Sequence, residues 1–275
     1  MATRLYIIFS LAFAAVAILF FELYLITSYL TVLFWFASLL GGMVLTFIIF
    51  VLFFWVYSFT IKEIDPHNMR NHGIVNSILQ LAFRFLNVKL VVTGKENIPL
   101  KGEKFIFVCN HQENYDIMAI KPVLKEHPLN FIAKKESFDW FLLGRWIRML
   151  GNVPIKRDAD RDAAESIIRG IKLYKEGIPM AIFPEGKRTF GNELTHFKPG
   201  AFKLATKPKA DILVGTIYDF SKVFKWWPIK RHKIYLHFHP LLKYETYQAM
   251  NTIELSQYVK QMIQTKLDEY KNIVK

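Results

Sequence analysis

The sequence predicts an α/β fold in which a central mixed sheet is covered by helices and is preceded by an N-terminal transmembrane helical hairpin. Two observations predict this arrangement. Residues 1–61 are almost entirely apolar, with Arg4 and Glu22 as their only charged side chains. The rest of the chain alternates short apolar runs with longer segments of helical periodicity, which is typical of α/β sheets. We therefore predict two domains, a membrane-anchoring hairpin over residues 1–61 and a second domain over residues 62–275.

Composition limits the possible classes of protein. A chain of 275 residues has room for an anchor and one ordinary domain, and 52% apolar residues exclude a disordered regulator. The single cysteine, Cys109, excludes an intrachain disulfide and favours a reducing compartment. The net charge of +13 lies on residues 62–275 and suits anionic lipid or nucleic acid. Because the chain is fixed to a membrane, we expect the bilayer to be the partner, and no nucleic acid.

The hairpin is predicted from length. One crossing needs about 20 apolar residues, so residues 5–61 are long enough for two helices, near 5–25 and 30–58. The expected turn lies around residues 22–28, where polar groups cluster, and Gly41-Gly42 is the competing break. A cleaved signal peptide fits less well, because no small-residue cleavage site follows the first apolar run.

Cations predict the orientation of the hairpin. Arg4 precedes it, Lys62 and Arg70 follow it, and the expected turn contains no Lys or Arg. The positive-inside tendency therefore places both ends in the cytoplasm and the second domain on the cytoplasmic face.

The second domain begins after an Asp65-Pro66 break with an amphipathic helix over residues 68–87. Seven apolar runs are candidate strands, at residues 89–93, 105–109, 129–133, 152–156, 179–183, 212–218 and 234–238. Helical segments are expected at residues 114–125, 138–149, 159–176, 199–207 and 251–273. In such a sheet the functional residues gather where strands end.

The first candidate site follows the strand at 105–109 and reads NHQENYD over residues 110–116. His111 and Asp116 can meet only if the histidine lies in the loop and the aspartate lies in the first turns of the helix. Asp116 then fixes the tautomer and leaves the other ring nitrogen free as a base. A His near an Asp at such a junction is also compatible with a purely structural hydrogen bond.

The second candidate site, FPEGKRT over residues 183–189, also ends a strand. It combines a carboxylate, Glu185, with a glycine, Gly186, and two cations. The planar guanidinium of Arg188 can bind two phosphate oxygens at once, whereas the ammonium of Lys187 offers a single point charge.

Together these two blocks resemble the glycerolipid acyltransferases of the 1-acyl-glycerol-3-phosphate acyltransferase type, whose hallmark is N-H-x4-D followed by F-P-E-G-[T/K]-R-[S/T]. Three further segments are similar to that family, and they cover residues 131–138, 151–157 and 196–205. One departure is residues 211–215 (DILVG), which lack the family's proline. This departure bears on acceptor or acyl-chain specificity more than on the reaction type.

The resemblance implies transfer of a fatty acyl group from a thioester to the free hydroxyl of lysophosphatidic acid, giving phosphatidic acid. It implies His111 as general base and Asp116 as its stabilising partner. The implied acceptor-binding residues are Glu185, Gly186, Arg188, Arg157, Lys134 and Lys135, with one of the two lysines sufficing, and the backbone near Gly186 as a possible oxyanion donor. It implies no cofactor, since acyl-CoA or acyl carrier protein serves as co-substrate.

Several alternatives stay open. The acceptor can instead be glycerol 3-phosphate or another lysophospholipid, and a catalytically silent lipid-binding protein would keep Arg188 without needing His111. Lys134, Lys135 and Arg157 can be ordinary solvated cations. Cys109 is a less favoured nucleophile, since strand alternation buries it.

No metal site is expected. His237 and His239 share a strand face, but no third ligand is in register, so a packing or surface role is preferred. Two segments have the composition of membrane contacts. Residues 221–233 contain five cations and two tryptophans, with a folded basic loop as the alternative, and residues 138–149 suit either the interface or a helix covering the sheet.

Overall fold

A computed structural model describes residues 2–24, 30–61, 64–156, 160–225 and 231–274. The chain divides into two compact units, Met1–Glu63 and Ile64–Lys275.

The first unit contains two helices, α1 (Ala2–Tyr24) and α2 (Leu30–Thr60), so both predicted helices are confirmed. The expected turn falls largely on residues 25–29, outside the described part of the chain. Gly41-Gly42 does not break α2. A Cβ on Gly42 would lie 2.8 Å from the carbonyl oxygen of Ser10, so glycine here allows α1 and α2 to approach closely.

One described helix, over Leu33–Thr60, is long and apolar enough to cross a membrane, while the apolar stretch of α1, Thr3–Leu19, is shorter. Large apolar side chains on this unit face outward, including Phe36 at 70% exposure and Phe53 at 66%. In water such a surface is costly, whereas in lipid it is solvated.

The second unit is built on a seven-stranded sheet of order β1-β7-β6-β2-β5-β3-β4. All neighbouring strands pair in parallel except β6 and β7, which pair antiparallel, so the predicted mixed sheet is confirmed. Each of the seven expected strands is present, with bounds β1 Val88–Thr93, β2 Ile106–Cys109, β3 Asn130–Lys134, β4 Val153–Ile155, β5 Met180–Ile182, β6 Ile212–Tyr218 and β7 His232–Phe238. The strand expected at residues 212–218 is therefore present in a chain that lacks the family's proline at residues 211–215.

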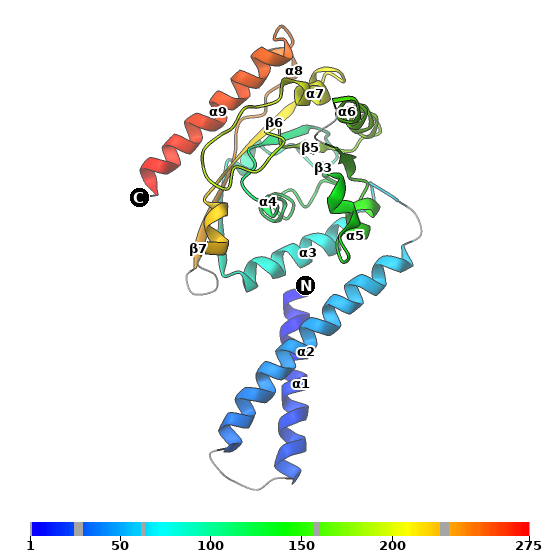
Figure 1. Ribbon diagram of the computed structural model, residues 1–275, viewed down its shortest axis with the longest axis vertical. Coiled ribbons are helices and arrows are strands. Elements are labelled where there is room, and N and C mark those ends of the chain that lie inside the picture. Colours follow the sequence, from blue (N-terminus) through cyan, green and yellow to red (C-terminus); the bar gives the residue numbers. More distant parts are fainter. Residues whose placement is uncertain (1, 25–29, 62–63, 157–159, 226–230, 275) are drawn as a thin grey trace. The chain divides into compact units, whose positions relative to one another are not determined.

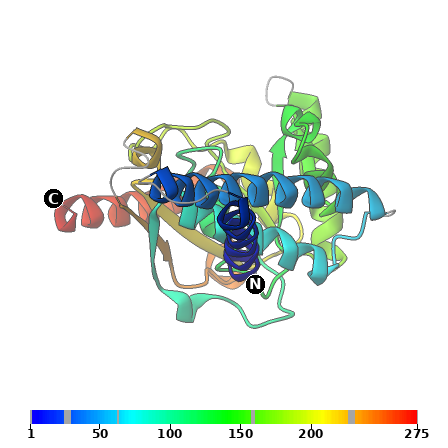
Figure 2. The same cartoon turned by 90° about the horizontal axis from the view of Figure 1, so that it is seen from below.

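Helices cover both faces of this sheet (Figures 1 and 2). One face packs against α6 (Asp160–Lys175), α7 (Lys203–Thr206) and α9 (Thr252–Ile273), through a core that includes Ile212, Leu255 and Val259. The other face packs against α3 (Met69–Phe85) and α4 (Asp116–Ile120), with Phe107 and Met118 in the core. The remaining elements are short and are η1 Lys95–Asn97, η2 Lys135–Asp139, α5 Gly144–Met149, η3 Pro199–Phe202, η4 Phe220–Lys225 and α8 Tyr244–Tyr247.

Two expected helices are shorter than predicted. The helix expected at 114–125 ends at Ile120 because Pro122 has no amide hydrogen, and the chain continues in turns such as Val123 N to Ile120 O. The segment 138–149 is α-helical only from Gly144 onward, where a Cβ would lie 2.1 Å from the Phe138 carbonyl oxygen. This close approach turns the chain between η2 and α5.

The parallel strands β2, β3, β4, β5 and β6 all end at one edge of the sheet. His111 follows β2, the FPEGKRT block extends from the end of β5, and Lys134 ends β3. The topology therefore gathers the candidate site residues along that edge.

Candidate active site

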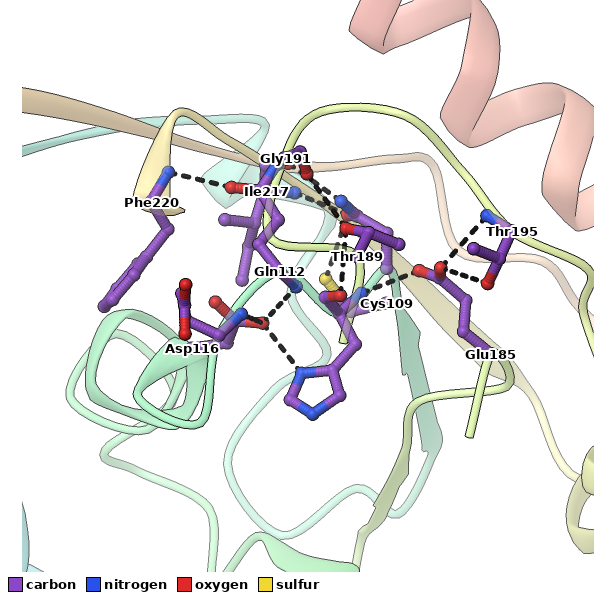
Figure 3. A network of polar contacts seen from close by, with 12 residues as sticks. Cys109, Gln112, Asp116, Glu185, Thr189, Gly191, Thr195, Ile217 and Phe220 are labelled. Carbon is purple, nitrogen blue, oxygen red and sulfur yellow. Dashed lines mark hydrogen bonds and ion pairs between the residues drawn. The ribbon is translucent and has the colours of Figure 1, made fainter. Parts of the chain in front are cut away.

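The histidine and the aspartate of the first block form a buried pair. His111 Nδ1 lies 2.9 Å from Asp116 Oδ2, with His111 in the loop after β2 and Asp116 as the first residue of α4. The predicted geometry is therefore confirmed. The same carboxylate oxygen accepts hydrogen bonds from the backbone amides of Gln112 at 2.7 Å and Glu113 at 3.1 Å, as Figure 3 shows in part. These donors fix the carboxylate on the ring nitrogen.

Burial shapes the electrostatics of the pair. Burial raises the pKa of Asp116, while the hydrogen bonds from His111 and from the two amides act in the opposite direction. The ring of His111 stacks on Phe183 at 4.3 Å between centroids. Within the described residues no hydrogen bond reaches His111 Nε2, and the side chain is 8% exposed. The ring is therefore held by Asp116 and Phe183, with Nε2 on the side away from the carboxylate.

Glu185 joins the two blocks. Its Oε1 accepts from the backbone amide of His111 at 2.8 Å, and its Oε2 accepts from the amide and hydroxyl of Thr195 at 3.1 and 2.8 Å (Figure 3). Glu185 is 2% exposed. One carboxylate oxygen therefore holds the His111 loop, and the other holds the chain at Thr195.

Gly186 makes the turn that follows. Its φ of +66° is in the left-handed region that favours glycine, and its amide donates to the carbonyl oxygen of Phe183 at 3.1 Å. The Gly186 amide is therefore engaged within the turn, and an oxyanion donor in the backbone near Gly186 stays a prediction.

Backbone contacts hold the end of the second block against the first. The amide of Thr189 donates to the His111 carbonyl at 3.0 Å, and that of Phe190 donates to the Gln112 carbonyl at 3.1 Å. The guanidinium carbon of Arg188, between these anchors and the Gly186 turn, lies 4.6 Å from the centre of the Phe190 ring. Arg188 is half-buried, and its charge acts to lower the pKa of Glu113 in the first block, which burial raises.

Two residues of this site have roles that the sequence did not predict. Asn110 pairs with the backbone of Ile217 on β6, accepting from its amide at 2.8 Å and donating to its carbonyl at 2.9 Å. The fully buried Gln112 donates to Asn192 and to Ile217, and accepts from the Phe220 amide (Figure 3). Both side chains join segments about 100 residues apart. Their only sequence signal is a polar run directly after a buried strand.

The remaining predicted cations are distributed differently. Lys134 is exposed at the end of β3, and its Nζ lies 3.6 Å from Glu136. Lys135 lines a separate cavity, whose walls include neither His111 nor Arg188. Arg157 lies outside the described residues. The structure thus brings together His111, Asp116, Glu185, Gly186 and Arg188, while Lys135 lines the separate cavity.

The alternative nucleophile is disfavoured by its surroundings. Cys109 is fully buried on β2, and burial together with the nearby Asp116 and Glu185 raises the pKa of its thiol well above its usual value. A protonated, enclosed thiol is a poor nucleophile.

His237 and His239 each contact a threonine. His237 Nδ1 lies 2.8 Å from Thr93 Oγ1, and His239 Nε2 lies 2.8 Å from Thr216 Oγ1. These contacts are compatible with the packing or surface role that the sequence favoured.

The two segments with membrane-like composition have different outcomes. Residues 226–230, which include Trp226 and Trp227, lie outside the described residues. In the segment 138–149, Phe138, Trp146 and Met149 are buried, whereas Trp140, Phe141 and Leu143 are exposed. This segment therefore covers the sheet and also presents apolar side chains outward.

Comparisons with known proteins agree with the geometry. Residues 89–244 match the family model described as Acyltransferase. A 1-acyl-sn-glycerol-3-phosphate acyltransferase of Borreliella burgdorferi is 29% identical over 72% of this chain and 79% of the relative. A chloroplastic protein of that name from Arabidopsis thaliana is 29% identical over 58% of this chain, which spans only 44% of the relative. The crystal structure of the 1-acyl-sn-glycerophosphate acyltransferase from Thermotoga maritima matches 81% of this chain and 87% of its own, with a TM-score of 0.63 and 27% identity.

Proposed function

Because this chain belongs to the acyltransferase family, we propose that it transfers a fatty acyl group from a thioester donor to the free hydroxyl of lysophosphatidic acid, giving phosphatidic acid for phospholipid synthesis. The observation that carries the proposal is the buried pair of His111 and Asp116, with Nε2 free beside the FPEGKRT block. The relatives' names supply the acceptor. The contact of His111 with Asp116 supports a general base at His111, and the weakly acidic hydroxyl of the acceptor requires such a base.

The proposed reaction runs without an acyl-enzyme. The hydroxyl oxygen of the acceptor attacks the thioester carbonyl while His111 Nε2 takes its proton. The carbon–sulfur bond then breaks, and the imidazolium returns the proton to the departing thiolate. Asp116, 2.9 Å from Nδ1, stabilises the imidazolium between the two steps.

We assign the acceptor phosphate to Arg188, with Lys134 and Arg157 as further partners. Arg188 is fixed beside the His111 loop by the backbone contacts of Thr189 and Phe190. A phosphate dianion is costly to bury without such charges, and a guanidinium can bind two of its oxygens. Glu185 and Gly186 act by shaping this acceptor site, through the His111 amide and the turn at Phe183.

The donor is acyl-CoA or acyl carrier protein in this proposal, and the reaction uses no metal or other cofactor. Both carriers are acidic, and the +13 net charge of the chain attracts them. The apolar helices of residues 1–61 associate the protein with a membrane, and the positive-inside tendency places the catalytic unit on the cytoplasmic face.

The deciding experiment compares wild type and His111→Ala in nanodiscs, with both donors against lysophosphatidic acid, glycerol 3-phosphate and a lysophosphatidylcholine. We expect transfer to lysophosphatidic acid in the wild type and a loss of at least about 10²-fold in the variant. His67→Ala is the matched control, because His67 is exposed and lies outside the site.

The outcomes separate the alternatives. Turnover of glycerol 3-phosphate alone would replace the proposed acceptor. No turnover by the wild type with any pair, together with lysolipid binding by both proteins, would favour a catalytically silent lipid-binding protein. Transfer by His111→Ala at the wild-type rate would overturn the proposed mechanism.

A further inference from the structure

A cavity lies at the β4 end of the sheet, and its lining contains no residue of the His111 cluster. It has a volume of about 490 Å³ and is lined by η2, α5, β4, α6 and the chain at Ile64 and Pro66. We call it the β4 cavity. Its apolar walls include Phe138, Val153 and Leu173. Its volume is within the usual range for small-molecule sites.

The polar lining of the β4 cavity is predominantly positive. Four cations, Lys135, Arg148, Arg169 and Lys172, face two carboxylates, those of Asp139 and Glu176. Arg148 pairs with Asp139 at 3.4 Å. Among the described residues, no ion pair involves Lys135, Arg169 or Lys172. The cavity therefore combines apolar walls with three cations that form no ion pair in the described part of the chain.

The surroundings of the β4 cavity are apolar as well. Trp140, Phe141 and Leu143 connect η2 to α5, two elements that line the cavity, and their exposures are 43%, 76% and 44%. Exposed aromatic side chains beside cations are typical of a surface that meets lipid headgroups.

The cavity wall is close in sequence to the apolar first unit. Ile64 is four residues after Thr60, the last residue of α2.

From these observations we propose that the β4 cavity binds an anionic phospholipid of the bilayer, with the headgroup phosphate at Arg169, Lys172 and Lys135 and adjoining apolar atoms against Phe138, Val153 and Leu173. A soluble anion would satisfy the cations but would leave the apolar walls without a partner. A zwitterionic lipid would add a positive headgroup next to unpaired cations. This site does not depend on acyl transfer, so it is distinct from the acceptor site proposed above.

The test uses the full chain in detergent and native mass spectrometry, with phosphatidylglycerol or phosphatidylcholine added. The variant is Arg169→Gln with Lys172→Gln. Its matched control, Arg161→Gln with Lys175→Gln, removes two exposed cations from the same helix without touching the cavity lining. We expect the wild type and the control to retain phosphatidylglycerol in preference to phosphatidylcholine, and the cavity variant to bind it at least tenfold more weakly.

His111→Ala should retain phosphatidylglycerol as the wild type does, which separates this result from the test of catalysis. Circular dichroism checks that the cavity variant is folded. Equal retention by cavity and control variants would overturn the proposal, and so would equal retention of the two lipids by the wild type. Displacement of phosphatidylglycerol by millimolar inorganic phosphate would assign the site to a soluble phosphate instead.

Discussion

At the scale of single residues, the charge of Asp116 distinguishes a catalytic pair from a structural hydrogen bond. In Asp116→Asn the amide oxygen can still accept from the amides of Gln112 and Glu113, so we expect the fold to survive. A neutral side chain no longer stabilises the imidazolium. We expect kcat to fall on the order of 10²- to 10⁴-fold, measured as acyl transfer in nanodiscs. Activity within a few-fold of the wild type would show that the pair is structural.

A second buried residue couples stability to pH. Lys121 is 2% exposed, and its Nζ lies 2.7 Å from His72 Nδ1 and 2.9 Å from the Leu129 carbonyl oxygen. Burial lowers the pKa of Lys121 to about 7, whereas in the unfolded chain it is about 10.4. Between these values the unfolded state binds more protons, so the free energy of unfolding rises with pH.

We therefore expect the wild type to gain roughly 1–2 kcal/mol of stability between pH 7 and 8.5, and Lys121→Met to lose this gain. Thermal unfolding of the detergent-solubilised chain, followed by circular dichroism, measures both. Lys125→Met is the control, because Lys125 has a side chain that is 62% exposed. A pH dependence that is the same in all three proteins would contradict a deprotonated Lys121 in the folded state.

The sequence predicted some of these residue-scale features and missed others for a physical reason. The contact of His111 with Asp116 depends on five residues of local chain, so the order of loop and helix was enough to predict it. Gln112 and Asn110 act on β6, more than 100 residues away, and their partners are mostly backbone groups that carry no side-chain signature. The buried pair of Lys121 and His72 was missed because a lysine is almost never fully buried.

At the scale of elements, Glu185 links the loop after β2 to the loop after β5. In Glu185→Gln one carboxylate oxygen becomes an NH₂ group, which then faces the donor amide of either His111 or Thr195. We expect a loss of about 1–3 kcal/mol in stability and a fall in kcat, with the KM for lysophosphatidic acid little changed. Unfolding and steady-state kinetics measure these. A rise in KM alone would instead identify Glu185 as a direct acceptor ligand.

The bounds of a helix or strand can be predicted from the sequence only where neighbouring residues in the chain determine them. The seven strands were predictable because each is a short apolar run between polar segments. The helix over 138–149 was predicted too long because some of its apolar side chains are buried against the sheet and others are exposed. Trp146 is buried and Phe141 is exposed, and composition alone does not separate them. The turn before Gly144 depends on a close approach to the Phe138 carbonyl, which is a property of the folded chain.

At the scale of the whole molecule, charge and hydrophobicity are segregated along the chain. Residues 1–61 carry no net charge, and the net charge of +13 lies on the remaining residues. In an anionic membrane this distribution favours insertion of the first unit and attraction of the second unit to the surface, worth about 1 kcal/mol for each nearby cation. A membrane interface satisfies both preferences, so we expect the protein to work at that interface.

The same segregation predicts a topology that labelling can measure. Cys109 is buried and the pKa of its thiol is raised, so in the folded protein it should not react with a membrane-impermeant maleimide. We expect Asn272→Cys to be labelled from the cytoplasmic side of sealed vesicles and Ser28→Cys, in the predicted turn, from the opposite side. The wild type is the control and should stay unlabelled until it is denatured. Labelling of both variants from one side would mean that the hairpin enters the membrane and returns without crossing it, because the turn would then share a compartment with the catalytic unit.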